Sequence, residues 1–353
     1  MIRAHGRQAR AEGRKRRAQQ NPLLGKGVDH QGFAIVGIRL SAWRIGLRCK
    51  LGTLQMPKFA ITGSSGRIGR AIHRLVCETG DVASIDRSPS SATTIVADLL
   101  DEDALKKGFD GAAAVFHVAA LHAPHVGLVA DREFERINVD GTLKALEIAR
   151  ASGVRTFILT STTALYGHAS QDDHTAVWVT EETDPLPRTI YHRTKLQAEA
   201  VARSQAGKNF DVRVIRMSRC FPEPAQVMAA YRLHRGVDAR DVASAHVAAA
   251  NHRGRNFEVF NVSGDTPFHK DDCDALKRDA PEVIRQRMPT LHAEFEARNW
   301  PLPRSIDRVY SSGKARRELN WSPRYGYEEV IAQLDRRSPE VLPECATGSN
   351  VAE

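Results

Sequence analysis

The stretch Lys58-Phe59-Ala60-Ile61-Thr62-Gly63-Ser64-Ser65-Gly66-Arg67-Ile68-Gly69 decides the fold that this sequence predicts. A short apolar run, residues 58–62, predicts a strand, and three glycines spaced G-x-x-G-x-x-G follow it. Apolar residues then recur with the period of a helix that has one buried face, at Ile68, Ala71, Ile72, Leu75 and Val76. Glycines between a strand and a helix allow a tight turn and a close approach of the backbone to a pyrophosphate. The stretch therefore predicts a dinucleotide-binding loop, and a purely structural glycine turn is the alternative.

The rest of the chain alternates short apolar runs with longer helical periods, the pattern of a parallel sheet covered by helices. Further strands are expected at 82–85, 93–96, 113–118, 156–160, 212–216 and 256–262, and helices near 131–151, 190–206 and 239–251. The predicted fold class is α/β, a Rossmann-type doubly wound parallel sheet. The section from Thr266 to Pro303 is polar and weakly patterned, and we assign it to a small C-terminal substrate-binding lobe.

Charge divides the chain into unequal parts. The net charge is +9, but residues 1–55 carry 12 Lys or Arg against two acids, so residues 56–353 are close to neutral. Residues 1–55 are expected to be a basic, disordered extension; an over-extended translation start, a transit peptide and a nucleic-acid-binding arm are alternative explanations of it. We expect a dinucleotide-binding domain at 56–217, a substrate-side lobe interleaved with the last strands at 218–340, and a tail at 341–353.

Composition argues against several classes of site. The five cysteines are scattered without a C-x-x-C pair, which fits a reducing compartment and no structural zinc or disulfide framework. His117, His122 and His125 straddle an expected strand end and a loop, so no metal site is expected there. No run reaches the ~18 apolar residues of a membrane span, since residues 33–43 are too few and include Arg39. We expect neither a membrane nor a nucleic-acid partner.

A second motif, Tyr191-His192-Arg193-Thr194-Lys195, lies on the helix expected at 190–206. Residues four apart share one helix face, so the Lys195 ammonium can sit beside the Tyr191 phenol. A free phenol has a pKa of about 10, and a nearby cation lowers it toward the range that general acid–base catalysis needs. Together with the upstream glycines, the pair predicts an enzyme in which a phenol moves a proton and a nicotinamide cofactor moves a hydride. A surface Tyr and a solvated Lys are the alternative.

Two acids follow the next expected strands. Asp86 closes the second strand, 23 residues after Gly63, where a carboxylate binds the adenosine ribose and favours NAD over NADP. Arg87 and Arg67 leave NADP open. Asp98, after the third strand, is expected either to meet the adenine amino group or to cap a helix from Leu99 to Lys106.

These motifs, in this order, resemble the extended short-chain dehydrogenases/reductases, the family of NAD-dependent sugar epimerases and dehydratases. The resemblance runs from Lys58 to about Val330. It rests on the glycine loop, Asp98-Leu99, His117-Val118-Ala119-Ala120, Asn138-Val139-Asp140-Gly141-Thr142, Ser161-Thr162-Thr163-Ala164-Leu165-Tyr166-Gly167, Tyr191-x-x-x-Lys195, Arg240-Asp241-Val242-Ala243-Ser244-Ala245-His246, Phe260-Asn261-Val262-Ser263 and Glu318-Leu319-Asn320-Trp321-Ser322-Pro323.

The resemblance implies roles for individual residues. It makes Tyr191 the catalytic acid/base, Lys195 its tuner and ribose anchor, and Thr162 the hydroxyl that orients the substrate, with Ser161 and Thr163 pointing elsewhere. Asn138 would brace the active site. Cofactor contacts are implied for Gly63, Ser65, Gly66, Arg67, Ile68, Gly69, Asp86, Asp98, Leu99, Ala119, Ala120, Tyr191 and Lys195.

Departures from the family pattern narrow the substrate. Only 15 residues separate Pro224 from Arg240, whereas enzymes that act on nucleotide sugars usually have a longer section there. The short form is more similar to relatives that oxidise free sugar acids, where Arg219 or Arg232 would clamp a carboxylate; ordinary surface cations are the alternative for both arginines. Thr163 and Ala164 stand where the dehydratase pattern has Asp and Glu, which argues against dehydration.

The sequence thus predicts an NAD-dependent epimerase or dehydrogenase acting on a secondary alcohol of a sugar-like substrate, and does not decide between the two reactions. A uronate-type dehydrogenase of free sugar acids is the alternative. A non-catalytic NAD(P)-sensing protein is the rival from another class, although its usual mark is a broken Tyr/Lys pair. A cytoplasmic location and a possible homodimer are also expected.

Overall fold

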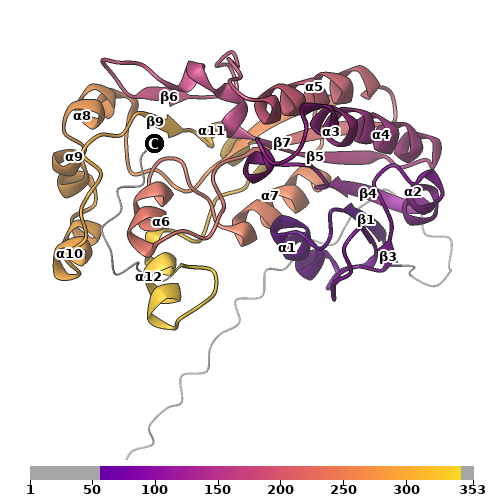
Figure 1. Ribbon diagram of the computed structural model, residues 1–353, viewed down its shortest axis with the longest axis horizontal. Coiled ribbons are helices and arrows are strands. Elements are labelled where there is room, and N and C mark those ends of the chain that lie inside the picture. The colour runs from indigo at the N-terminus through magenta and orange to yellow at the C-terminus, as the bar shows by residue number, and fades with distance from the viewer. Residues whose placement is uncertain (1–55, 343–353) are drawn as a thin grey trace, which may run out of the picture. The chain divides into compact units, whose positions relative to one another are not determined.

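Seven parallel strands form the central sheet, in the order β3-β2-β1-β4-β5-β7-β8 (Figure 1). This computed structural model describes residues 56–342. The strands are β1 (Lys58–Thr62), β2 (Asp81–Asp86), β3 (Ile95–Val96), β4 (Ala112–His117), β5 (Thr156–Thr162), β7 (Asp211–Met217) and β8 (Phe257–Val262). Because β1 pairs with β2 on one side and β4 on the other, the strand order reverses between β1 and β4. Doubly wound sheets bind ligands beyond the carboxyl ends of the strands at that switch point, and the predicted fold class is confirmed.

Helices cover both faces of this sheet (Figure 1). On one face α1 (Arg67–Val76) packs against α7 (Ala239–Asn251). On the other face lie α2 (Glu102–Phe109), α4 (Gly141–Ala151) and α5 (Ile190–Gln205). Their apolar faces and the strands bury one core, which includes Leu105, Leu146 and Ala198 from the helices and Val115, Phe157 and Val214 from the strands. The strands are apolar on both faces because both are covered.

A second core lies in the C-terminal lobe. Its helices are α6 (Ala225–Arg232), α8 (Cys273–Arg278), α9 (Ala280–Arg287), α10 (Pro289–Ala297) and α12 (Tyr327–Asp335). They bury a cluster that includes Leu276, Ile284, Leu291, Phe295 and Val330. The section from Thr266 to Pro303, which has no clear pattern in the sequence, therefore holds three short helices. Next to this lobe, β6 (Val177–Val179) pairs with β9 (Arg308–Tyr310), and α11 (Gly313–Leu319) packs against β8.

Several expected elements differ in detail. The helix expected near 131–151 consists of α3 (Asp131–Glu135), a π-helical turn at Arg136–Asp140, and α4. The prediction that Asp98 caps the next helix is wrong, because α2 begins at Glu102 and the Asp101 carboxylate accepts from Ala104 N at 3.0 Å. Short 3₁₀ turns lie at Ala123–His125, Thr163–Tyr166, His168–Ser170 and Lys270–Asp272.

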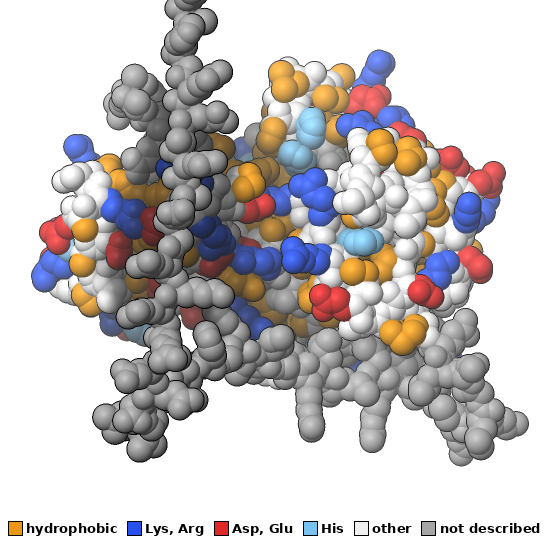
Figure 2. All heavy atoms as spheres, turned by 90° about the horizontal axis from the view of Figure 1, so that it is seen from below, with side chains coloured by type: hydrophobic (Ala, Val, Ile, Leu, Met, Phe, Trp, Pro, Cys, Tyr) orange, Lys and Arg blue, Asp and Glu red, His pale blue; other side chains and the backbone are white. Residues whose placement is uncertain are grey.

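The predicted domain boundaries can be compared with the structure only between residues 56 and 342. The described residues belong to one compact unit, and the division at residue 217 stays a prediction. The expectations for residues 1–55 and for 343–353 lie outside the described residues. Between 56 and 342, no helix is long and apolar enough to cross a membrane. On the face shown in Figure 2, Lys and Arg side chains are interspersed with Asp, Glu and apolar side chains.

Candidate active site

The glycine loop joins β1 to α1 at the switch point of the sheet. Gly63 has a φ of +75°, and a Cβ there would lie 2.6 Å from Ala119 N. A Cβ on Gly69 would lie 2.1 Å from Gly63 O, so the fold itself requires the first and third glycines. A Cβ on Gly66, in contrast, would meet only Gly63 O, at 3.4 Å. The space in front of Gly66 is therefore open, as a loop that admits a pyrophosphate requires.

The N-terminus of α1 is free to bind an anion. Its N-cap, Gly66, offers no side-chain cap, and the first turn contains no acid. The first N–H groups and the helix dipole can then act on a phosphate. The buried Ile68 anchors this turn against the sheet. The loop, the open space and the uncapped helix fit a dinucleotide.

Asp86 lies at the end of β2, directly beside the loop. Its Oδ2 accepts from Ser65 N at 2.9 Å and its Oδ1 from Ser88 N at 2.8 Å. Ser65 Oγ donates to Ser88 O and lies 2.8 Å from Thr93 Oγ1. The carboxylate thus has a fixed position next to the phosphate-binding loop, where the ribose is expected.

Arg67 faces away from Asp86. Its guanidinium forms an ion pair with Glu340, and its side chain hydrogen bonds Cys220, which follows β7. Because β2 and β7 lie on opposite sides of β1, these partners hold Arg67 away from the ribose end. That orientation weakens the case for Arg67 as a ligand of an NADP phosphate.

Asp98 and Leu99 follow β3. Asp98 Oδ1 accepts from Leu100 N at 2.9 Å and lies 4.0 Å from Arg136 Nη1. Leu99 is buried against Gly141, where a Cβ would lie 2.7 Å from Leu99 Cδ2. Asp98 keeps an exposed oxygen beside the sheet edge, and its contact with adenine stays a prediction.

The end of β4 connects to the glycine loop through a buried histidine. Ala119 N donates to Thr62 O at 3.1 Å. His117 Nδ1 lies 2.8 Å from Thr62 Oγ1, and Nε2 lies 3.1 Å from Thr142 Oγ1. Since Thr142 Oγ1 donates to Asn138 O, it accepts from His117, which places the histidine proton on Nε2. Burial lowers the pKa of His117 to about 3, so the ring is neutral.

His117 is thereby separated from the two other histidines of this region. The rings of His122 and His125 contact each other, with centroids 4.5 Å apart, in the loop after β4. Ala119 and Ala120 precede that loop and are partly exposed. Their expected contact with the nicotinamide ribose stays a prediction.

Asn138 connects the segment after β4 to α5. It lies in the π-helical turn, and its amide pairs with both backbone groups of Leu121, at 2.8 and 2.9 Å. Its Nδ2 also lies 3.1 Å from Thr194 Oγ1 on α5. The amide therefore fixes the helix that carries Tyr191 relative to the end of β4.

Tyr191 and Thr162 meet at the carboxyl end of β5. Their side chains are hydrogen bonded, and Thr162 Oγ1 also accepts from Ala164 N at 3.1 Å. Burial raises the pKa of Tyr191 to about 12, and the bond to Thr162 offsets only part of this. The sequence predicted a pKa lowered by Lys195; in the protein alone desolvation dominates instead.

Lys195 lies one helical turn after Tyr191 and is 3% exposed. Its Nζ donates to Thr160 O at 2.7 Å. Burial lowers the pKa of Lys195 to about 8, while Glu199 opposes the decrease. The ammonium form still predominates at neutral pH.

Glu199, which the sequence analysis did not single out, anchors a buried polar network. Its carboxylate accepts from Ser161 Oγ at 2.5 Å and pairs with Arg216 over contacts of 2.7 to 3.2 Å. Arg216 Nη1 donates to the Tyr166 hydroxyl at 2.9 Å. Ser161 thus points to Glu199 while Thr162 points to Tyr191, in agreement with the choice among the three hydroxyls. The available signal for Glu199 was its place four residues after Lys195 on the same helix face.

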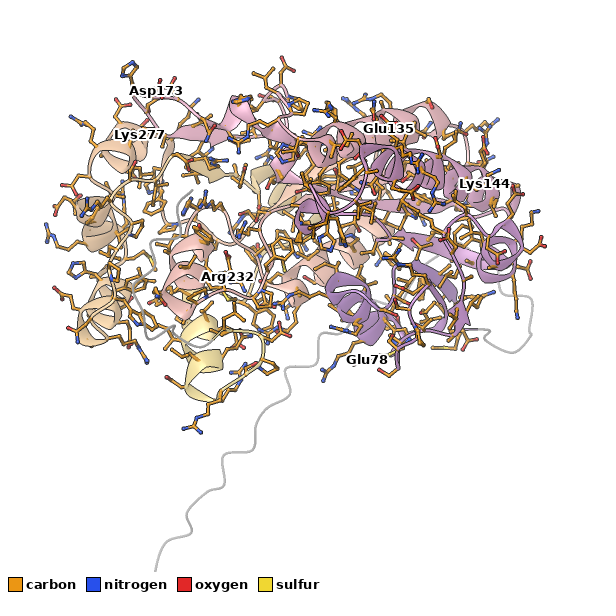
Figure 3. The ribbon with its side chains drawn as sticks, viewed as in Figure 1. Glu78, Glu135, Lys144, Asp173, Arg232 and Lys277 are labelled. Atoms are coloured by element: carbon orange, nitrogen blue, oxygen red, sulfur yellow. The ribbon has the colours of Figure 1, made fainter. Side chains whose placement is uncertain are left out.

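Three arginines line a pocket between α1, α6 and the loop after β7. Arg67, Arg219 and Arg232 share it with Cys220, Phe221 and Tyr231. Arg219 is bound by the Glu223 carboxylate at 2.6 to 2.9 Å. Arg232 is 4% exposed and pairs with Asp238 at 3.0 Å, but its buried Nε has no partner. Arg232 is the last residue of α6 and is labelled in Figure 3.

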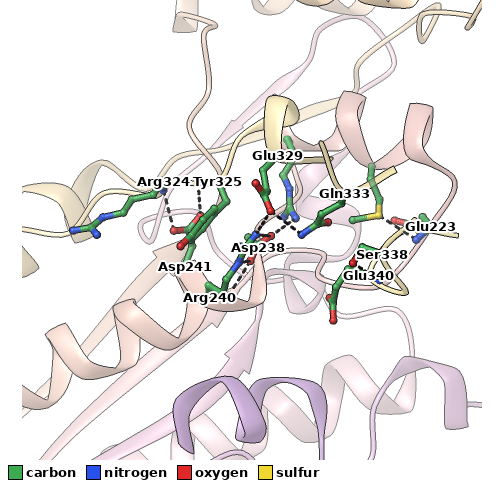
Figure 4. Close-up of polar contacts among 12 residues, drawn as sticks. Glu223, Asp238, Arg240, Asp241, Arg324, Tyr325, Glu329, Gln333, Ser338 and Glu340 are labelled. Carbon is green, nitrogen blue, oxygen red and sulfur yellow. Dashed lines mark hydrogen bonds and ion pairs between the residues drawn. The ribbon is translucent and has the colours of Figure 1, made fainter. Parts of the chain in front are cut away.

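The C-terminal end of the described chain contacts two of the residues that line this pocket, Arg67 and Glu223. Leu342 N donates to Glu223 O at 3.0 Å, and Glu340 supplies the partner of Arg67. Figure 4 shows Glu340 and Ser338 near Glu223. No sequence motif indicated these contacts, because they join residues far apart in the chain, more than 270 positions for Arg67 and Glu340.

Comparisons with known proteins show what this chain is similar to. A model of the NAD dependent epimerase/dehydratase family matches residues 59–227. UDP-glucose 4-epimerase of Streptomyces lividans is 24% identical over 317 residues, which cover 75% of this chain and 91% of that protein. L-arabinose 1-dehydrogenase (NAD(P)(+)) of Haloferax volcanii is 28% identical over 165 residues, which cover 44% of this chain and 63% of that protein.

Solved structures share the fold over most of their length. A short-chain dehydrogenase/reductase superfamily protein from Agrobacterium tumefaciens with bound NAD has a TM-score of 0.60 at 19% identity, over 79% of this chain and 97% of that chain. The UDP-Glc/GlcNAc 4-epimerase from Campylobacter jejuni has a TM-score of 0.57 at 20% identity, over 80% and 99%. At such identities the likeness establishes the fold and leaves the substrate open.

Proposed function

We propose that the chain is a member of the NAD-dependent epimerase/dehydratase family, whose model matches residues 59–227, and that it transfers a hydride to or from a secondary alcohol of a sugar-like small molecule. The observation that carries the proposal is the hydrogen bond between Thr162 and Tyr191, with the buried Lys195 one helical turn after Tyr191. This trio lies at the carboxyl edge of β5, two strands from the glycine loop of β1. A substrate oxygen placed there would face both hydroxyls.

Bound NAD would supply or accept the hydride. The loop around Gly66 and the N-terminus of α1 would hold its pyrophosphate, and Asp86 its adenosine ribose. Thr162 would orient the substrate oxygen, and Tyr191 would move the proton on that oxygen.

The protonation states of Tyr191 and Lys195 fit these proposed roles. At neutral pH Tyr191 keeps its proton, since its pKa is about 12, so it can donate to a carbonyl oxygen that is being reduced. In the oxidation direction Tyr191 must accept a proton. The ammonium of Lys195 would then stabilise the phenolate.

The test is cofactor binding followed by a substrate panel monitored at 340 nm. Binding of NAD, with growth of reduced cofactor on one sugar or sugar acid, identifies a dehydrogenase. Product without net reduction identifies an epimerase. If neither NAD nor NADP binds, the proposal is wrong.

A second candidate is a dehydrogenase of free sugar acids. The short section after Pro224 consists largely of α6, which places the unpaired Arg232 Nε at the pocket shared with Arg219. A guanidinium of this kind suits a substrate carboxylate. Turnover of uronates but not of nucleotide sugars would select this candidate, and the reverse would reject it. The expected homodimer and cytoplasmic location stay predictions.

A further inference from the structure

We infer that Glu199 is a positioning residue of the proposed site, whose carboxylate keeps Lys195 an ammonium ion and fixes the end of β5 that carries Thr162. The inference rests on the proposed function, because Lys195 and Thr162 have their roles only there.

The first argument is geometric. Glu199 follows Lys195 by one helical turn and Tyr191 by two, so the three residues share a face of α5. That face meets three successive residues of β5. Lys195 Nζ donates to Thr160 O, the Glu199 carboxylate accepts from Ser161 Oγ, and Tyr191 bonds the Thr162 hydroxyl.

The second argument is the balance of buried charge. Lys195 and Glu199 are 3% and 5% exposed, so water contributes little to the solvation of either. Burial of an unpaired ammonium disfavours its charged form. The carbonyl of Thr160 is only a dipole, whereas Glu199 brings a full negative charge, which acts on Lys195 against the effect of burial.

The other groups around Lys195 cannot replace that charge. His117 on β4 is neutral, with a pKa of about 3, and Tyr191 is a neutral phenol. His246 on α7 lies 2.8 Å from Thr160 Oγ1 and is also neutral, with a pKa of about 4. Arg216 on β7 is a cation held by Glu199 itself. Among the described residues, Glu199 is therefore the carboxylate that supports the ammonium.

The experiment measures the protonation of Lys195 directly, in protein labelled with ¹³C at lysine Cε. The Lys195 signal is identified by its absence in Lys195→Met, and its chemical shift is followed with pH. We expect a midpoint near pH 8 in the wild type and a midpoint at least about one pH unit lower in Glu199→Gln. Ser161→Ala is the matched control, since it removes the hydrogen bond but keeps the carboxylate, and its midpoint should not move. A folded Glu199→Gln with the wild-type midpoint overturns the inference.

A second variant covers the case in which Glu199→Gln does not fold because Arg216 is left buried without a counter-ion. The double variant Glu199→Gln/Arg216→Met removes the whole pair, and such replacements by neutral residues are often tolerated. Its midpoint should still fall, by less than in the single variant, because the repulsion from Arg216 also disappears. A midpoint unchanged or raised overturns the inference. Glu199→Asp, which keeps the charge, should restore most of the wild-type value.

This measurement is independent of the proposed function. Wild-type protein that binds no NAD would refute the proposed function, while the Lys195 midpoint would still decide the role of Glu199. If NAD binds, its dissociation constant should rise with increasing pH in both proteins. The rise should begin about one pH unit lower in Glu199→Gln than in the wild type. A parallel loss of affinity at every pH would indicate a merely structural role and overturn the inference.

Discussion

In the proposed reaction, Tyr191 would donate a proton to the substrate oxygen and Thr162 would orient that oxygen with its hydroxyl. We expect Tyr191→Phe to bind NAD within about threefold of the wild type, because the ring and Lys195 remain. Turnover should fall at least about 100-fold, in the range of ~10² to 10⁴ for general acid–base catalysis. Steady-state rates and NAD titration check both expectations.

The control for this prediction is Thr162→Ser, which keeps a hydroxyl next to Tyr191 and should retain most of the turnover. Thr162→Val should lower turnover without unfolding the protein, since its shape is conserved. If Tyr191→Phe turns over at the wild-type rate, the assignment of the proton donor is wrong.

The three glycines of the loop are not equivalent. Gly66→Ala should fold with wild-type stability, because the new Cβ would meet only Gly63 O at 3.4 Å, yet it should lose at least about tenfold in NAD affinity. Gly69→Ala should lose about 1–3 kcal/mol of unfolding free energy, because its Cβ would lie 2.1 Å from Gly63 O. Denaturant unfolding and NAD titration of both variants separate the two effects. Equal stability losses in the two variants would contradict this division.

How far the sequence predicts the site is clear at this scale. Motif spacing led to Tyr191, Lys195 and Thr162; in the structure Tyr191 is hydrogen bonded to Thr162, while Lys195 donates to the carbonyl of Thr160 on the same strand. It did not lead to Glu199, because the partner Arg216 lies on β7 and no local pattern couples a helix residue to a strand residue 17 positions later. The pKa of Tyr191 was also predicted with the wrong sign for the protein alone, since sequence spacing shows a neighbouring charge but not desolvation.

At the scale of elements, the motif at residues 240–246 contacts the motif at 318–323 and the two residues that follow it. Asp241 on α7 accepts from Arg324 N at 2.9 Å and from Tyr325 N at 3.1 Å (Figure 4). Trp321 Nε1 donates to Ser244 Oγ at 2.8 Å. The guanidinium of Arg240 lies 3.5 Å from the centre of the Tyr325 ring. The two motifs are therefore the two halves of one contact between the sheet layer and the C-terminal lobe.

This contact yields a stability prediction. Asp241 is 1% exposed, so Asp241→Ala should remove both hydrogen bonds that its buried carboxylate accepts from Arg324 N and Tyr325 N. A hydrogen bond to a charged group contributes about 1.5–3 kcal/mol, and we expect a loss of about 2 kcal/mol or more in the free energy of unfolding. Urea denaturation measures it, with Asp103→Ala as control because the Asp103 side chain is 98% exposed. Equal stability of the two variants would contradict the role of Asp241.

Elements were predictable where their signal is local. The strands of the main sheet have short apolar runs and the helices α1, α5 and α7 have a helical apolar period, and each was placed within a few residues. The helices α8, α9 and α10 are only 6, 8 and 9 residues long, too short for a clear period. The pairing of β6 with β9 joins three-residue strands about 130 positions apart, which no local pattern encodes.

At the scale of the whole molecule, buried neutral histidines link stability to pH. His117 and His234 have pKa values lowered to about 3, and His246 to about 4, with burial as the main cause in each. His117 lies beside the glycine loop, His234 Nδ1 lies 2.9 Å from Arg308 O in the lobe, and His246 contacts β5. Acid therefore acts on the sheet, the site and the lobe together.

The direction of this pH dependence follows from the histidine pKa values in the folded and unfolded states. In the unfolded chain these histidines titrate near pH 6.5, whereas in the folded protein they stay neutral down to about 3 or 4. The unfolded state thus binds more protons below pH 6.5, and stability falls as pH decreases. Each histidine contributes about 1.4 kcal/mol per pH unit once the pH is well below 6.5. We expect His234→Gln to reduce the slope of unfolding free energy against pH between 6.5 and 5 by about one such contribution. His174→Gln, at an exposed position, should leave the slope unchanged, and identical slopes for both variants and the wild type would show that these buried rings do not govern the acid response.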